Sequence, residues 1–296
     1  MFFEGFSLQH TTIAGTRYRF RAGGAGRPLL LLHGQPQTHA MWHRVAPLLA
    51  AAGFHVVCPD LPGHLPEAEL ALDLLRLMDA LGHDRFGVAG HDFGAHVACR
   101  LSLDVPERVE RLAVVEVVPV LDHVGRADMS FALSGYRGCW FGQLHPKPEA
   151  LAVKAPDEWF RLAAPDEPRD FFDAEAVADY LLEGAWNEER RGHGAAAEGP
   201  VPALDMMERG QRRRIPCPMM VIWGRRGRIG GWYDPRTLWQ HCAAHEVLGS
   251  ELDSGHFVAE EAPEALAALL EPFFSEALAE PAEPMPPSRA TPDSSS

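Results

Sequence analysis

The chain has 296 residues, 46% of them hydrophobic, and a formal net charge of −14. This length allows one large domain or a core with an insertion, and the apolar content is ample for a buried core. The negative charge argues against nucleic acid and anionic membrane surfaces as partners, and no apolar run reaches the roughly 20 residues of a membrane-spanning helix.

Cysteine usage and the N-terminus predict a cytoplasmic protein. The five cysteines are widely spaced without a Cys-x-x-Cys pair, so we expect neither a disulfide framework nor a zinc site. The stretch from Met1 to Gly15 has no basic region of the kind found in signal peptides. The fifteen histidines show no clustered ligand spacing, and we expect no metal and no cofactor.

The first 120 residues alternate between strand and helix patterns. Ile13–Ala22 alternates arginines with aromatic residues, which predicts a half-exposed edge strand. Pro28–Leu32 is continuously apolar, as expected of a strand covered on both faces. Further strands are expected at Phe54–Cys58, Phe86–Ala89 and Arg111–Val118, and helices at Ala40–Ala52, Glu67–Leu81 and Phe93–Leu103. This order predicts an α/β fold with a mainly parallel sheet, helices on both faces, and ligands at the carboxyl ends of the strands.

After Pro119 the alternation stops and later resumes. Residues 121–208 show no convincing strand but several aromatic residues and short helical stretches such as Phe172–Leu182, which predicts an inserted helical cap. The later elements are expected at Met219–Trp223 (strand), Pro235–Cys242 (helix), Glu246–Gly249 (strand) and Pro263–Phe274 (helix). We therefore expect two core parts, 1–120 and 209–275, the cap between them, and a disordered tail at 276–296, where Pro, Ser, Ala and Glu dominate.

The chemistry is predicted to centre on Gly90-x-Asp92-x-Gly94, which lies between a strand pattern and a helix pattern. This is the pattern of a nucleophile elbow, in which small flanking residues let backbones pass closely. The usual nucleophile is serine, but here the position holds a carboxylate. A carboxylate is already ionised at neutral pH, so it needs no base for a first attack on carbon.

Two other motifs agree with the elbow. His33-Gly34-Gln35-Pro36 follows an early strand, where the backbone N–H groups of Gln35 and Phe93 would form an oxyanion hole. His256 lies in a loop before the last helix. Each pattern alone is usually an ordinary turn or loop, but the order nucleophile, acid, histidine is that of α/β-hydrolases. Together they predict an active site for a small-molecule substrate.

The chain resembles the fluoroacetate (haloacetate) dehalogenases, in the aspartate-nucleophile branch of the α/β-hydrolases. The resemblance lies in residues 33–47, 60–63, 90–96, 106–119 and 254–263. In that family an aspartate displaces halide and forms a covalent ester, which water activated by histidine then hydrolyses. The resemblance implies that Asp92 is the nucleophile and His256 the base.

The acid that orients His256 is expected to be Glu116. Many α/β-hydrolases place this acid after the strand that corresponds to Met219–Trp223, but there the chain has no carboxylate until Asp234. The dehalogenases place an aspartate after the strand that follows the elbow, and Glu116 occupies this position. Because glutamate is one methylene longer, its fit to His256 is itself a prediction.

The departures from the family pattern concern substrate binding. Phe93 and His96 occupy the positions of two arginines that clamp the substrate carboxylate in the family. Phenylalanine makes no such bond and histidine offers one pH-dependent donor, so fluoroacetate should not bind in the family's way. In the cap, Tyr136 and Trp140 lie near the family's halide-binding positions, and Trp140 is as readily explained as cap core.

Two alternatives to a dehalogenase stay open. An epoxide hydrolase uses the same ester chemistry but needs cap tyrosines to protonate the epoxide oxygen, and Tyr136 and Tyr180 are the cap tyrosines of this chain. A degenerate hydrolase fold retained for binding would explain the lost arginines, although it would not need an intact nucleophile, acid and base. Homodimers are common in the resembling family, and the sequence carries no interface signal of its own.

Overall fold

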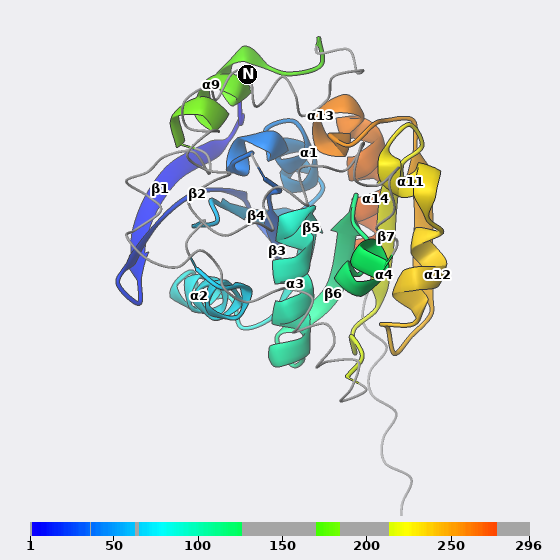
Figure 1. Ribbon diagram of the computed structural model, residues 1–296. Helices are drawn as coiled ribbons and strands as arrows, with labels where there is room; N and C mark the ends of the chain where they lie inside the picture. The colour runs from blue at the N-terminus through cyan, green and yellow to red at the C-terminus, as the bar shows by residue number, and fades with distance from the viewer. Residues whose placement is uncertain (1, 36, 63–64, 126–169, 184–212, 277–296) are drawn as a thin grey trace, which may run out of the picture.

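The protein forms one mainly parallel sheet with helices on both faces (Figure 1). The computed structural model describes residues 2–35, 37–62, 65–125, 170–183 and 213–276. The strand order is β1-β2-β4-β3-β5-β6-β7-β8. Strand β2 pairs antiparallel with both β1 and β4, and every later pairing in the sheet is parallel. The predicted α/β fold is therefore confirmed.

The described elements follow one another in the order expected of strands connected by helices. The strands are β1 (Phe6–Ile13), β2 (Thr16–Gly24), β3 (Arg27–Leu32), β4 (Phe54–Pro59), β5 (Phe86–His91), β6 (Val109–Val115), β7 (Met219–Gly224) and β8 (Val247–Leu252). The helices are η1 (His39–Trp42), α1 (Val45–Ala51), α2 (Glu67–Ala80), α3 (Phe93–Asp104), α4 (Val120–Gly125), α9 (Ala174–Glu183), α11 (Arg228–Trp232), α12 (Pro235–Gln240), α13 (Val258–Glu261) and α14 (Pro263–Ser275).

The apolar run of β3 is continuous because both of its faces are covered. Leu29 and Leu31 pack into a core that α1 and α14 complete, whereas Leu30 and Leu32 pack into a second core with α2 and α3. All four side chains are fully buried. Successive side chains of a strand point to opposite faces, so a strand between two layers of helices needs apolar residues at every position.

The N-terminal strand prediction was wrong in one respect. The stretch expected as a single edge strand is the turn and second strand of a hairpin, and β1 lies at the edge instead. The turn places Ala14 and Gly15 at φ of 48° and 89°. Arg19, which alternation places on the exposed side, is only 6% exposed because it pairs with Asp60 and Asp179.

Other differences lie at the ends of elements. The helix expected over residues 40–52 is divided into η1 and α1, and α11 follows β7 where no helix was expected. Strand β6 ends at Val115, because Glu116 adopts a φ of 54° and turns the chain out of the sheet. Within the expected cap the structure describes α4 and α9, together with a few residues before α9. The rest of 121–208 and the tail from 277 lie outside the described residues.

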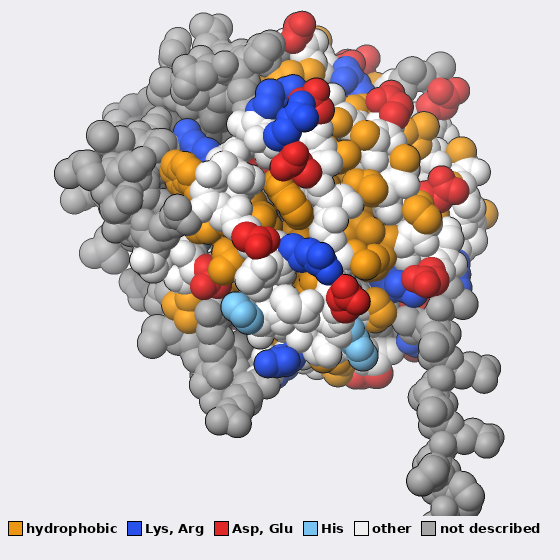
Figure 2. Space-filling view, turned by 90° about the vertical axis from the view of Figure 1, so that its right-hand side faces the viewer, with side chains coloured by type: hydrophobic (Ala, Val, Ile, Leu, Met, Phe, Trp, Pro, Cys, Tyr) orange, Lys and Arg blue, Asp and Glu red, His pale blue; other side chains and the backbone are white. Residues whose placement is uncertain are grey.

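The side of the molecule that carries α11 and α12 has a mixed surface (Figure 2). Hydrophobic side chains are interspersed there with acidic and basic ones, so this face is not a patch of a single sign. Leu248, on the last strand of the sheet, is 46% exposed. Among the described helices none is both long and apolar enough to cross a bilayer.

The contact between α3 and β3 depends on Gly94. A β carbon at this position would lie 2.5 Å from the carbonyl oxygen of His33. We expect Gly94→Ala to lower the free energy of unfolding by about 1–3 kcal/mol, because backbone atoms must move apart. Gly231→Ala is the matched control, because nothing lies within 4 Å of its added carbon. It should leave the free energy of unfolding unchanged or raise it by up to about 1 kcal/mol. Equal losses in urea denaturation would contradict this account.

Candidate active site

Asp92 occupies a strained turn between β5 and α3. Its backbone has φ 49° and ψ −118°, a conformation that residues other than glycine rarely adopt. The turn is tight because Gly90 lies against α3, where an added β carbon would be 2.3 Å from the carbonyl oxygen of Gly94. The Asp92 N–H donates to the carbonyl of Val115 at 3.0 Å, which ties the turn to β6. The expected strand, sharp turn and helix are present.

His256 and Glu116 lie beside Asp92, as the sequence predicted. Nε2 of His256 is 3.9 Å from Oδ2 of Asp92, and Nδ1 is 3.2 Å from Oε2 of Glu116. Three segments far apart in the sequence therefore meet at the carboxyl ends of β5, β6 and β8. The longer side chain of glutamate does reach His256.

Glu116 is almost completely buried, with 2% of its surface exposed. Its second oxygen, Oε1, accepts the N–H of Gly224 at 2.7 Å, and a β carbon at Gly227 would lie 2.9 Å from the same oxygen. Burial raises the pKa of Glu116 above its usual range, although hydrogen bonds from His256 and Gly224 favour the ionised form. When Glu116 is ionised, Nδ1 of His256 is the donor of this bond, which leaves Nε2 directed at Asp92.

Asp92 is ionised at neutral pH. Burial opposes its charge, but the neighbouring His256 and the N–H of Phe93 outweigh it and lower the pKa of Asp92. The side chains of Asp92 and His256 keep 39% and 35% of their surfaces exposed. Asp92 thus combines a charged carboxylate with a partly exposed side chain.

The two expected oxyanion-hole residues flank Asp92. The N–H of Phe93 donates to Oδ1 of Asp92 at 2.6 Å. The loop that contains Gln35 approaches from the other side, since a β carbon at Gly34 would be 2.7 Å from the Asp92 β carbon. Glycine at this position therefore lets the loop of Gln35 come close to Asp92.

His91 has a role that was not predicted. Its Nε2 donates to the backbone carbonyl of His256 at 2.7 Å, and burial lowers its pKa to about 3, so the ring is neutral. His91 therefore connects β5 to the loop of His256. Its position next to Asp92 is the only sequence signal that points to it.

A histidine–tyrosine pair also lies at the edge of the site. Nδ1 of His123, in α4, is 3.0 Å from the hydroxyl of Tyr233, which follows α11. Burial lowers the pKa of His123, and the charge of Asp92 opposes this shift. His123 follows Glu116 by seven residues. Nothing in the local sequence of either residue indicates that they meet.

The remaining predicted residues fall in different places. His96, in α3, is half-buried and lowers the pKa of Asp92. Asp234, the rejected acid candidate, caps α12 by accepting from the N–H of Thr237 and is exposed. Tyr136 and Trp140 lie outside the described residues. Among the residues that the structure does describe, no group of three or more His, Cys, Asp or Glu could hold a metal ion.

A strand–turn–helix elbow faced by a histidine that is bound to a carboxylate is the arrangement typical of α/β-hydrolases. The chain belongs to the alpha/beta hydrolase family, whose model matches residues 29–269. Family membership confirms the fold predicted from the sequence and does not itself name a substrate.

Two kinds of hydrolase are similar to this chain. It is 30% identical to a fluoroacetate dehalogenase of Burkholderia sp., covering 93% of this chain and 96% of that protein. It is also 30% identical to a soluble epoxide hydrolase of Corynebacterium sp. (strain C12), covering 89% and 95%. A solved structure from Pseudomonas aeruginosa, provisionally named an epoxide hydrolase, has a TM-score of 0.82 at 33% identity, covering 93% of this chain and 97% of that one.

The backbone strain at Asp92 should lower the free energy of unfolding by an amount that two variants can measure. Asp92→Gly and Asp92→Ala both remove the carboxylate, but only glycine adopts a φ of 49° without steric cost. We expect the glycine variant to be more stable than the alanine variant by about 1–2 kcal/mol. At an unstrained, non-glycine position glycine is instead the less stable of the two. Chemical denaturation of both proteins measures the difference, and an alanine variant as stable as the glycine one would disprove the strain.

Proposed function

We propose that the protein is a hydrolase that forms a covalent ester on Asp92 and hydrolyses it with water activated by His256. The observation that carries this proposal is the direction of His256. Its Nδ1 faces buried Glu116 at 3.2 Å, and its Nε2 faces the Asp92 carboxylate at 3.9 Å. A base whose free nitrogen faces a carboxylate in an elbow suits the hydrolysis of an ester formed on that carboxylate.

In the first step Oδ2 of Asp92 attacks the carbon that bears the leaving group. The new bond is carbon–Oδ2, and the broken bond is carbon–halogen, whose electron pair leaves with the halide. Oδ1 accepts the N–H of Phe93 at 2.6 Å and becomes the carbonyl oxygen of the ester. That N–H is then already aimed at the oxygen that gains charge in the second step.

In the second step water attacks Cγ of Asp92 and gives a proton to Nε2 of His256. The separation of 3.9 Å between Nε2 and Oδ2 is too long for a direct hydrogen bond and suits a water between them. Negative charge develops on Oδ1, next to the N–H groups of Phe93 and Gln35. The bond from Cγ to Oδ2 breaks, and the product alcohol takes the proton from His256. The other proton of the water, left on the carboxyl of Asp92, passes to solvent and restores the carboxylate. Glu116 stabilises the imidazolium formed on the way.

The substrate that we propose is a halogenated small molecule. The similarity to a fluoroacetate dehalogenase over 93% of the chain supports this choice. Phe93 and His96 cannot clamp a carboxylate as an arginine pair does. Fluoride is a poor leaving group, so chloro- and bromo-substrates should tolerate an altered site better than fluoroacetate does.

Epoxide hydrolysis is the second candidate, and the similarity to an epoxide hydrolase supports it. The same nucleophile would open the ring, and an O–H group would protonate the oxygen. The hydroxyl of Tyr180 already donates to Glu260 at 2.8 Å. Among the described tyrosines, Tyr233, with its bond to His123, is the better candidate for such a donor.

The ester should accumulate when the base is absent. We expect His256→Ala, exposed to haloacetates, haloalkanes and a styrene-type epoxide, to gain mass on Asp92. A gain equal to the substrate minus hydrogen halide indicates dehalogenation, and a gain equal to the whole substrate indicates epoxide opening. Intact-protein mass spectrometry measures both, and the double variant with Asp92→Asn is the control.

The absence of any reaction would count against the proposal. If neither His256→Ala nor the wild type reacts with any compound of the panel, the non-catalytic binding fold becomes the better account. An adduct that persists in the double variant would show that Asp92 is not the nucleophile.

Glu116 should be needed for turnover, whereas Asp234 should not. In Glu116→Gln the new amide can donate to Nδ1 of His256, which moves the ring proton to Nε2 and removes the base. We expect turnover to fall about 100-fold or more. Asp234 is the exposed residue that caps the N-terminus of α12, and the turnover of Asp234→Asn should stay within about twofold of the wild type. Steady-state kinetics with the compound that labels His256→Ala measures both turnover rates. If Asp234→Asn lost turnover and Glu116→Gln kept it, the choice of Glu116 as the acid would be overturned.

A further inference from the structure

Helix α9 lies against the loop that follows β3. Its residues Asp179 and Tyr180 are neighbours in sequence, yet they bind two different sets of partners. Asp179 contacts Arg19 and Thr38, and Tyr180 contacts Glu260. Both η1, which follows that loop, and the residues before α14 are therefore connected to one turn of α9.

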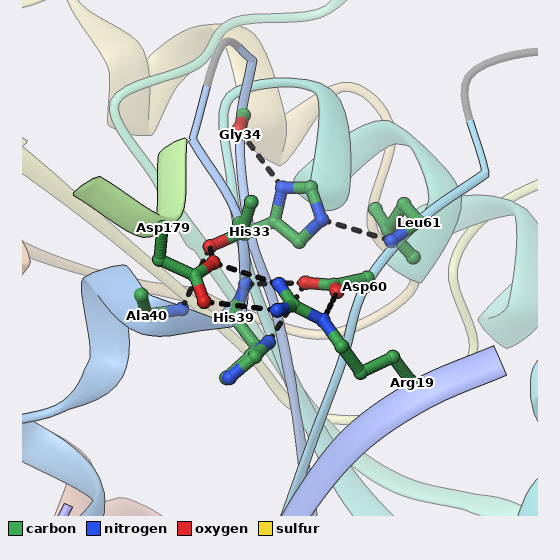
Figure 3. A network of polar contacts seen from close by, with 9 residues as sticks. Arg19, His33, Gly34, His39, Ala40, Asp60, Leu61 and Asp179 are labelled. Carbon is green, nitrogen blue, oxygen red and sulfur yellow. Dashed lines mark hydrogen bonds and ion pairs between the residues drawn. The ribbon is translucent and has the colours of Figure 1, made fainter. Parts of the chain in front are cut away.

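The first set of contacts is centred on Arg19 (Figure 3). Its Nη1 and Nη2 donate to the two oxygens of Asp179 at 2.9 and 2.7 Å, and its Nε donates to Asp60 at 2.5 Å. Thr38 Oγ1 donates to Asp179 at 2.5 Å. A forked guanidinium between two carboxylates fixes the planes of all three groups, which a single point charge would not do.

Asp60 extends this set to η1. Its second oxygen accepts the backbone N–H of His39 at 2.9 Å and Nδ1 of His39 at 2.8 Å (Figure 3). Although burial opposes its charge, His39 and Arg19 hold the pKa of Asp60 well below its usual range. Thr38 and His39, which follow the loop of Gln35, are thus attached to β2 and α9 through charged groups.

The second set is a buried cluster of Gln37, Tyr180 and Glu260. The Tyr180 hydroxyl donates to Oε1 of Glu260 at 2.8 Å, and Nε2 of Gln37 donates to Oε2 at 2.6 Å. Tyr180 and Glu260 are 0% and 1% exposed. Burial raises the pKa of Glu260 to about 8, so the carboxyl is mostly neutral at pH 7.

The partners in these two sets lie close to the catalytic groups along the chain. Gln37 and Thr38 follow Gln35 by two and three residues. Glu260 follows His256 by four residues. One helix therefore contacts residues that closely follow both Gln35 and His256 in the chain.

We propose that α9, through Asp179 and Tyr180, positions the loops of Gln35 and His256 for the second step, the hydrolysis of the ester. The inference rests on the proposed function for its chemical meaning. Asp179 and Tyr180 are positioning residues, because they act through Gln37, Thr38 and Glu260 rather than on the substrate.

The two chemical steps should respond differently to a loss of this positioning. Ester formation needs Asp92, whose turn is attached to β6 and does not involve α9. Ester hydrolysis needs the base and both oxyanion donors, and small misplacements of such groups are costly. A Tyr180 that protonated an epoxide would instead act in the first step.

The test compares Tyr180→Phe with Tyr18→Phe. Both tyrosines are fully buried and donate to a carboxylate, Tyr18 to Asp73 at 3.0 Å, but Tyr18 lies between β2 and α2. The first measurement is the exchange of backbone amide hydrogens, which needs no substrate. We expect Tyr180→Phe to speed this exchange in peptides that cover 33–44 and 254–262, and Tyr18→Phe to leave these peptides as in the wild type.

Single-turnover kinetics then separates the two steps, using the compound that labels His256→Ala. Tyr180→Phe should hydrolyse the ester roughly 10- to 100-fold more slowly, with ester formation unchanged, so that the adduct becomes visible at steady state. Tyr18→Phe should lower the melting temperature similarly without ester accumulation.

A conservative replacement should rescue the network. Glutamine at position 260 still accepts from Tyr180, and its NH2 group can donate to Oε1 of Gln37 once that amide turns over, because this oxygen has no other hydrogen-bond partner. Glu260→Gln should therefore keep most of the hydrolysis rate. Glu260→Leu, which has a similar volume but no acceptor, should lose it as Tyr180→Phe does.

Three outcomes would overturn the inference. They are unchanged hydrogen exchange in Tyr180→Phe, equal slowing of both steps, and equal rates for Glu260→Gln and Glu260→Leu. If His256→Ala gains no adduct, the proposed function fails instead, and the exchange data still decide whether α9 holds the two loops.

Discussion

The hydrogen bond between His256 and Glu116 is the interaction on which the arrangement of the site depends. A carboxyl that is 2% exposed is costly to bury unless its oxygens are satisfied, and here His256 and the N–H of Gly224 satisfy them. Because Glu116 occupies Nδ1, the other nitrogen of the ring must face Asp92. Buried Glu116 therefore favours one tautomer of His256 and fixes the direction of its ring.

The same region stores strain at the ends of two neighbouring strands. Asp92 and Glu116 follow β5 and β6 directly, and both adopt positive φ without being glycine. The parallel pairing of β5 with β6 aligns His91 with Val115, so the two strained residues leave the sheet side by side. Such backbone conformations persist only where the surroundings compensate for them, and the sheet, α3 and His256 do so here.

Much of the fold followed from patterns that local sequence carries. The leucines of β3 indicate a strand covered on both faces, and the glycines around Asp92 indicate close backbone contacts. The strand, the elbow and the helix that follows it were therefore predictable. Arg19 was placed wrongly because alternation describes exposure only when a charged side chain stays in water. Its partners Asp60 and Asp179 are 41 and 160 residues away, and no local pattern encodes such pairs.

By itself, the sequence determined the class of protein: an α/β fold with Asp92, Glu116 and His256 in hydrolase order. Short-range rules suffice for this, since periodicity and turn residues act within a few positions. Only the tertiary structure decided that Glu116 reaches His256, that His91 binds the backbone of His256, and that α9 contacts Thr38 and Glu260. These are contacts between side chains distant in the chain, and they depend on how the elements pack rather than on the residues beside them.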